Sequence, residues 1–246
     1  MKKSLVLSVL SALLLVAGCG PKDNSLKMIT EATFPPYEFL RGQEIVGIDV
    51  EICRAVAEKL GRPFLAETVD FDSVIPAIVS GKADLAAAGI TITEDRKQKV
   101  DFSDPYVKTG IVVIYKKSNP FREPQLLKGK TIGVQAGTTS ENYVLEQLKQ
   151  EPERFKSPAE AVAALKSGRV AFVISDIDPA KNCVKGEADL ALSGFITTEE
   201  YAVAIRKGQP ELLKAINETI AELKRNGKLA TWIAQYTEES DRLKDK

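Results

Sequence analysis

The chain has 246 residues, with 34 Lys and Arg, 34 Asp and Glu, and no histidine. That length suits one large domain or two smaller lobes, and the balanced charge argues against a surface that binds nucleic acid or another polyanion. The lack of histidine excludes Ser-His-Asp and Cys-His catalysis and the commonest zinc sites. We therefore expect neither a metal nor a cofactor.

The N-terminus has the features of a secretory signal. Lys2 and Lys3 precede an apolar run over residues 5–16, which is too short for a comfortable membrane span. The run leads into Val-Ala-Gly and then Cys19, a pattern that resembles the lipobox of bacterial lipoproteins. We expect removal of residues 1–18 and a lipid on Cys19, which would tether the protein in the periplasm or on the outer cell surface. A plain signal peptide with an incidental cysteine is the alternative.

Residues 19–26 are polar and include glycine and proline, so we expect a short tether. Beyond the tether, Cys53 and Cys183 are far apart in the sequence and form no Cys-x-x-Cys motif. An oxidising compartment would allow a disulfide between them. Cys53 also lies in a helical pattern with Val56 and Leu60, which favours two separate buried thiols.

After the tether, short apolar runs alternate with helical patterns, which predicts an α/β architecture. The predicted strands are residues 27–30, 83–88, 110–115, 131–135 and 170–174. The predicted helices are 49–60, one from the N-cap Asp72 to 80–81, one from the cap Thr93 to Lys99, one from about 140, 158–167 before Gly168, one from Pro210 to Gly227, and a last turn or two at 229–236.

Two segments of the chain repeat one pattern. Residues 77–89 and 164–176 each contain a helix, a glycine C-cap, a basic residue and a buried strand. Ligands of open α/β sheets bind beyond the carboxyl ends of the strands. The repeat therefore places Gly89 and Asp176 at ligand-competent positions in two halves of the molecule, although a helix–glycine–strand unit also recurs by chance.

Six motifs occur in one order along the chain. They are TEATFPPYEF at 30–39, GIDVEI at 47–52, FDSVIPAIVSG at 71–81, AGITITEDR at 88–96, DFSDPY at 101–106 and GVQAGTT at 133–139. Together they resemble the polar amino-acid-binding proteins of ABC importers, solute-binding protein family 3. The resemblance extends over essentially the whole chain that follows the signal.

The resemblance implies a two-lobed, type II periplasmic-binding-protein-like fold, in which two hinge strands join the lobes and the ligand lies in the cleft. Lobe one would comprise residues 27–108 and 202–246, and lobe two residues 109–201. The hinge crossings would fall near 107–110 and 199–202.

The resemblance also implies a site for a zwitterionic amino acid, whose two buried charges both need partners. Arg96, at the end of the TxTxxR pattern, would hold the α-carboxylate through its planar guanidinium fork. The hydroxyl of Thr91 and the backbone of Ala88 and Gly89 would bind the same end of the ligand, since glycine lets the backbone approach closely.

Lobe two would complete the contacts to the main-chain atoms of the ligand. Thr138 and Thr139 begin a helix, so their N–H groups can also hold the carboxylate. Asp176 would accept the α-ammonium group. Asp178 is the alternative, because the segment Ser-Asp-Ile-Asp offers two carboxylates.

Four further residues match positions around the ligand side chain. Phe34 and Phe71 would flank it as aromatic walls. Glu31 would meet its far end, which favours a cationic group but also suits a glutamine amide, and Gln135 could line the same pocket. Arginine, lysine or histidine is therefore the expected class of ligand.

By this resemblance the protein captures an amino acid by lobe closure, as a monomer, and delivers it to a permease and its partner ATPase in the membrane. The same fold also occurs in a periplasmic dehydratase that acts on cyclic prephenate-like acids, so an enzyme is the rival interpretation. A ligand sensor for a receptor is a third.

Overall fold

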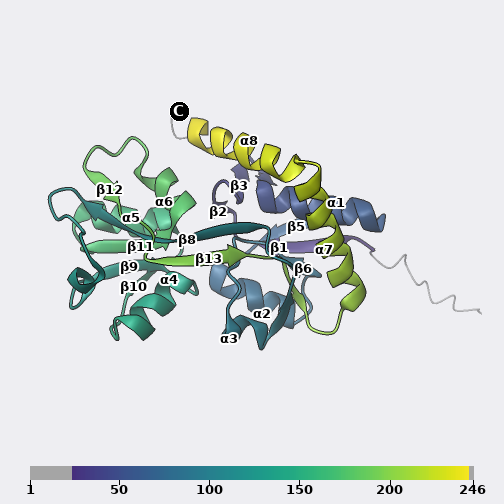
Figure 1. Ribbon diagram of the computed structural model, residues 1–246, viewed down its shortest axis with the longest axis horizontal. Helices are drawn as coiled ribbons and strands as arrows, with labels where there is room; N and C mark the ends of the chain where they lie inside the picture. The colour runs from purple at the N-terminus through teal and green to yellow at the C-terminus, as the bar shows by residue number, and fades with distance from the viewer. Residues whose placement is uncertain (1–23, 244–246) are drawn as a thin grey trace, which may run out of the picture.

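The computed structural model describes residues 24–243, which form two α/β lobes side by side (Figure 1). The two lobes confirm the predicted fold class. Cys19 and the expected signal peptide lie outside the described residues. Between residues 24 and 243, no helix combines the length and the apolar character that a membrane crossing requires.

Lobe one is built on a five-stranded sheet of order β5-β1-β6-β14-β7. β1 runs parallel to β5 and β6, whereas β14 runs antiparallel to β6 and β7. The strands of lobe one, with a small hairpin sheet of β2 to β4, are β1 (Leu26–Thr30), β2 (Thr33–Phe34), β3 (Glu38–Arg41), β4 (Glu44–Val46), β5 (Phe64–Thr68), β6 (Leu85–Ala86), β7 (Val100–Phe102) and β14 (Ala204–Arg206). Its helices are α1 (Ile48–Leu60), α2 (Val74–Val79), α3 (Glu94–Lys97), α7 (Pro210–Arg225) and α8 (Lys228–Leu243).

Helices cover both faces of this sheet. Successive side chains of a strand point to opposite faces, so Met28 joins the core formed with α1, α7 and α8, whereas Ile29 joins the core formed with α2. The carboxyl end of β1 is thereby held between two apolar layers. The segment that follows β1 carries Glu31 and leads into β2, which contains Phe34.

Lobe two has a six-stranded sheet of order β10-β9-β11-β8-β12, in which β13 also pairs with β8. The elements that complete lobe two are β9 (Ile132–Gln135), α4 (Thr139–Asn142), β10 (Glu153–Phe155), α5 (Pro158–Ser167), β11 (Phe172–Asp176), α6 (Ile177–Val184) and β12 (Leu190–Leu192). β9, β10 and β11 are parallel, so Gln135 and Asp176 both end strands at one edge of the sheet.

Two antiparallel strands connect the lobes. β8 (Val107–Lys116) and β13 (Thr197–Tyr201) pair from Val107 opposite Tyr201 to Ile111 opposite Thr197. β8 then continues into the sheet of lobe two, and the chain after β13 enters β14 of lobe one. The hinge crossings expected near 107–110 and 199–202 stay a prediction, and residue 202 lies just beyond β13.

The C-terminal helix is longer than the predicted turn or two at 229–236. α8 has 16 residues and reaches lobe two, where Asn182 Nδ2 donates to the Ser240 carbonyl at 3.4 Å and Lys185 Nζ donates to that of Asp241 at 2.8 Å. The sequence after Tyr236 is polar and lacks the apolar periodicity that would have indicated a continuing helix. Packing against α6 provides the missing support.

Two other elements differ from the sequence prediction, and the start of a third agrees with it. Asp72 is not a helix N-cap, because it lies inside a short 3₁₀ turn that precedes α2. β6 has two residues instead of the six predicted at 83–88, and the helix expected from about residue 140 starts at Thr139 and continues as a π-turn. No disulfide joins Cys53 and Cys183.

Gly47, just before α1, generates a stability prediction. Its φ is 134°, and an added Cβ would overlap the Tyr37 carbonyl. We expect Gly47→Ala to lower the free energy of unfolding by about 3 kcal/mol, because both strain and overpacking act there. The matched control is Gly42→Ala, where φ is also positive but nothing lies within 4 Å of the new methyl group. It should cost only about 1 kcal/mol. Urea denaturation measures both, and equal losses would contradict the prediction.

Candidate functional site

Most of the predicted site residues surround one small cavity between the lobes. Its lining consists of Phe34, Phe71, Gly89, Thr91, Arg96, Thr138, Thr139 and Asp176. Its volume is about 10 Å³, room for about one water molecule. An amino acid can therefore enter only when the lobes or these side chains move apart.

Arg96 joins the two lobes. Thr93 caps α3 by accepting the Arg96 N–H at 3.2 Å, which fixes where the side chain leaves the helix. The guanidinium donates through Nη1 to the Thr91 carbonyl at 2.8 Å and through Nη2 to the Gly137 carbonyl of lobe two at 3.0 Å. It also lies over the Phe71 ring, 5.4 Å from the centroid. Burial lowers the pKa of Arg96, but a guanidinium stays charged in proteins.

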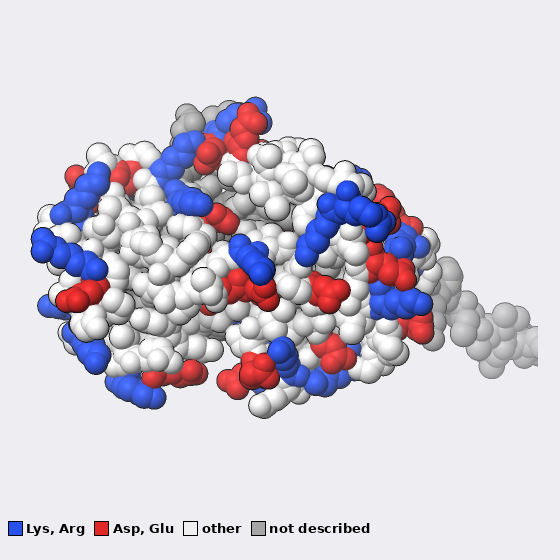
Figure 2. All heavy atoms as spheres, in the orientation of Figure 1, with Lys and Arg blue, Asp and Glu red and all other residues white. Residues whose placement is uncertain are grey.

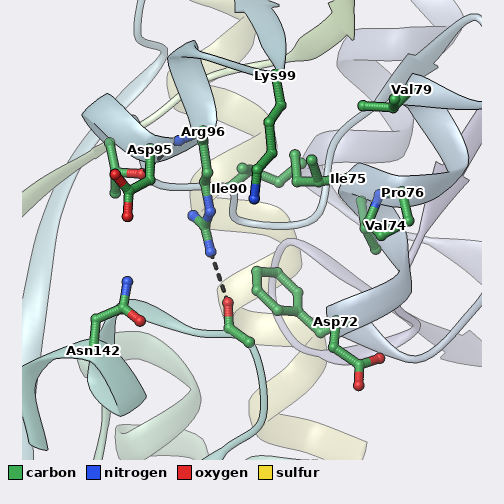
Figure 3. A pocket seen from close by; sticks show the side chains of 13 residues that line it. Asp72, Val74, Ile75, Pro76, Val79, Ile90, Asp95, Arg96, Lys99 and Asn142 are labelled. Atoms are coloured by element: carbon green, nitrogen blue, oxygen red, sulfur yellow. Dashed lines mark hydrogen bonds between the residues drawn. The ribbon is translucent and has the colours of Figure 1, made fainter. Parts of the chain in front are cut away.

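A larger groove of about 520 Å³ lies on the other side of Arg96. Figure 3 shows the Arg96 side chain reaching from α3 toward the Gly137 carbonyl, with Ile75, Val79 and Ile90 on the lobe-one side. Because Arg96 and Phe71 line both spaces, Arg96 forms part of the wall between the groove and the small cavity.

Asp176 ends β11 and is buried, with its Oδ1 accepting a hydrogen bond from Tyr201 Oη at 2.5 Å. Burial raises the pKa of Asp176 to about 7, and nearby Glu199 adds to the rise, whereas Tyr201 and Arg96 act in the opposite direction. Asp178 lies elsewhere. It accepts from Tyr37 Oη at 2.8 Å and lines a pocket between α6 and α8.

Gly89 and its neighbour Ala88 contribute differently. Gly89 has a φ of 53°, and a Cβ at this position would contact the Phe34 ring at 2.8 Å, so the close approach needs glycine. The side chain of Ala88 packs in the core with Ile29 and does not line the cavity. Only the backbone of Ala88 can take part in the predicted role.

Glu31 and Gln135 also lie outside the cavity lining, since Glu31 follows β1 and Gln135 is the last residue of β9. Thr33 donates to Glu31 Oε1 at 2.5 Å, and Gln135 Nε2 donates to the Lys156 carbonyl at 2.9 Å. Glu31 Oε2 and Gln135 Oε1 are buried without a partner. Burial raises the pKa of Glu31, and Thr33 and nearby Gln135 oppose that rise.

Two residues of the hinge strand β13 belong to the site although the sequence did not single them out. Thr91 Oγ1 donates to Glu199 Oε2 at 2.7 Å, and Tyr201 holds Asp176. Among the charged groups, Glu199 also raises the pKa of Arg96 the most. The sequence contains only an acidic pair before a tyrosine at the expected crossing, which gives no sign of these contacts.

Figure 2 shows Lys and Arg interspersed with Asp and Glu over the visible face, without a patch of one sign. Within residues 24–243, no group of Cys, Asp and Glu is arranged to hold a metal ion.

Comparison with known proteins gives a consistent result. The profile of the family "Bacterial extracellular solute-binding proteins, family 3" matches residues 26–239. The arginine-binding extracellular protein ArtP of Bacillus subtilis (strain 168) is 34% identical, over 93% of this chain and 95% of that protein.

Two solved structures of an ancestral arginine-binding protein are similar throughout. The structure bound to arginine has a TM-score of 0.80 and 40% identity, covering 87% of this chain and 98% of its own. The structure bound to glutamine has a TM-score of 0.80 and 39% identity, covering 87% of this chain and 97% of its own. Together with the profile match and the two-lobed fold, these similarities establish that the chain belongs to family 3 of the bacterial extracellular solute-binding proteins.

Proposed function

We propose that this protein captures a basic L-amino acid, with arginine, lysine and histidine as the first candidates and glutamine as the next, and delivers it to the permease of an ABC importer. The observation that carries this proposal is the pair of buried, unpartnered acceptors Glu31 Oε2 and Gln135 Oε1. Buried polar atoms normally have partners. Two acceptors are suited to a side chain that is rich in donors.

The two acceptors come from different lobes, which ties the choice of ligand to closure. Glu31 follows β1 of lobe one, and Gln135 ends β9 of lobe two. A guanidinium has five N–H donors in a planar fork and can serve both acceptors at once. An ammonium or imidazolium group can do the same with fewer donors, and a glutamine amide with two.

The main-chain groups of the ligand find partners of opposite charge. Arg96, with Thr91 and the N–H groups of Thr138 and Thr139, would hold the α-carboxylate, and Phe34 and Phe71 would flank the side chain. Asp176 would accept the α-ammonium, and we prefer it to Asp178 because it lines the cavity, whereas Asp178 is bound to Tyr37.

Closure then follows from contacts to both lobes. A ligand that touches Arg96 on one lobe and Asp176 on the other binds the closed form better than the open form, and so shifts the population toward closure. The paired strands β8 and β13 would absorb the motion. The closed form is the one that would dock on the permease, with transport driven by the partner ATPase.

The remaining parts of the proposal concern location and chemistry. The protein would be exported, held at the membrane by a lipid on Cys19, and monomeric. It would have no catalytic role. Turnover of a prephenate-like acid by the purified domain would instead establish the dehydratase alternative, and genes for a permease and an ATPase beside its own would favour transport over sensing.

Glu31 gives the first test. In isothermal titration calorimetry with lipid-free protein stripped of bound ligand, Glu31→Gln should weaken arginine binding by about tenfold to about a hundredfold, because a charged hydrogen bond is lost. Glutamine binding should change less. The matched control is Glu67→Gln, which alters an exposed carboxylate on β5 and should bind like the wild type. Equal arginine affinity in Glu31→Gln and wild type would refute the assigned role, and no binding of any amino acid would refute the proposed function.

Asp176 gives a pH prediction. Its pKa in the ligand-free protein is about 7, and an ammonium ligand requires the ionised form. Affinity should therefore be highest above this pKa and fall as the pH drops through it, by up to about tenfold per pH unit. Binding near neutral pH should release protons, which calorimetry in buffers of different ionisation enthalpy detects.

Three variants separate Asp176 from its neighbours. Tyr201→Phe removes a hydrogen bond that favours the ionised carboxylate, so the fall in affinity should begin at higher pH. Asp176→Asn should weaken binding and abolish the fall in affinity with falling pH. Glu31→Gln should retain that fall. If the affinity of Asp176→Asn still fell with falling pH, the titration would belong to another group.

A further inference from the structure

A pair of buried carboxyl groups lies in lobe one, next to the cavity residue Gly89. Glu38 of β3 and Asp49 of α1 are both fully buried, with 0% of each residue exposed. Glu38 and Tyr106 both lie close enough to Asp49 to affect its pKa, but the buried hydroxyl of Tyr106 makes no hydrogen bond. Cys53, one turn further along α1, is buried beside them.

Two ionised carboxylates could not satisfy this arrangement. Carboxylates only accept hydrogen bonds, so both oxygens of Glu38 and Oδ1 of Asp49 would be buried without a donor. The groups that act on Glu38 are Asp49, Glu31 and the Cys53 thiol, and each of them disfavours its ionisation. A single proton on Glu38 supplies the missing donor and removes the repulsion between the two carboxylates.

The pair is linked to the ligand cavity through one backbone group. Asp49 Oδ2 accepts the N–H of Gly89 at 2.9 Å. On its other side Gly89 packs closely against the Phe34 ring, since a Cβ added at Gly89 would lie 2.8 Å from that ring. Gly89 is therefore held between the carboxyl pair and an aromatic wall of the cavity.

We propose that Glu38 is a carboxylic acid that donates a hydrogen bond to Asp49, and that this pair positions the Gly89 backbone against the bound ligand. Glu38 and Asp49 are positioning residues, because neither lines the cavity. The first half of the proposal stands on the buried cluster alone, and the second half rests on the proposed function.

The pKa shifts of the two carboxyl groups agree with a protonated Glu38 and an ionised Asp49. Burial raises the pKa of Glu38 well above its usual range, and the charge of Asp49 raises it further. Burial also raises the pKa of Asp49, but the Gly89 N–H, Tyr106 and Glu38 all lower it. Asp49 is thus the member of the pair that keeps the negative charge.

Infrared difference spectroscopy tests the protonation without any ligand. The spectrum of the wild-type protein, recorded well above the pKa of Asp176, should contain the C=O stretch of a protonated carboxylic acid. This band should be absent from Glu38→Gln, which keeps a neutral donor of the same size. A wild-type spectrum without an acid band that Glu38→Gln removes would overturn the proposed protonation.

Calorimetry and amide hydrogen exchange test the positioning. Glu38→Leu removes the donor and Asp49→Ala removes the acceptor of the Gly89 N–H, so both should speed exchange at Gly89 and weaken arginine binding by about tenfold. Glu38→Gln should stay within about twofold of the wild type, as a rescue by the conservative variant. Cys53→Ala is the matched control, a truncation in the same cluster that should lower stability without changing affinity.

Each result has a distinct meaning. Glu38→Leu or Asp49→Ala with wild-type affinity and exchange would overturn the positioning role, as would Glu38→Gln with the affinity loss of Glu38→Leu. If either disruptive variant fails to fold, the affinity of Glu38→Gln still tests the positioning role, and the wild-type spectrum still tests the protonation of Glu38. If the wild type binds no amino acid, the proposed function fails, whereas the spectrum and the exchange at Gly89 still test the pair.

Discussion

The cleft depends on keeping one guanidinium charged in a partly buried position between the lobes. Arg96 has carbonyl acceptors on both sides, from Thr91 and Gly137, but carbonyls supply only partial charge. Glu199 and Asp176 supply the negative potential that opposes the desolvation of Arg96. These residues belong to α3, the hinge strand β13 and the end of β11, so Arg96 can be accommodated only where the two lobes and the hinge meet.

The balance of charge around Arg96 also bears on the class of ligand. Asp176 lines the cavity, Glu199 binds Thr91 of its lining, and Glu31 lies on the segment just before β2. Arg96 is the one cation among these residues. Burial raises the pKa of both Glu31 and Asp176, which is the response of acidic groups that lack sufficient positive charge. A zwitterion alone would leave this excess in place. A ligand with a cationic side chain would reduce it, which adds a charge argument for a basic amino acid to the argument from hydrogen-bond acceptors.

Local signals in the sequence predicted the parts of the fold and site that depend on local chemistry. α5 begins at Pro158 and ends before Gly168 as expected, because a proline at the first position and a left-handed glycine after the last are short-range signals. Residues of the sequence motifs, such as Phe34 and Arg96, do line one cavity. The roles of Glu199 and Tyr201 depend on pairing with Thr91 and Asp176, 108 and 25 residues away in the chain, and no local pattern encodes that pairing. The long α8 escaped prediction for a similar reason, since α6 of the other lobe supports its polar end.

The position of Glu199 and Tyr201 suggests how binding is coupled to motion. Both lie on β13, which pairs with β8 across the connection between the lobes, and Tyr201 also bridges to Thr91 of lobe one. A rotation of these strands therefore displaces the partners of Asp176 and Thr91 directly, without a relay through other elements. Thr91 and Asp176 also line the cavity, and in the proposed function they contact the ligand. Ligand contacts and hinge contacts would then share the same two side chains.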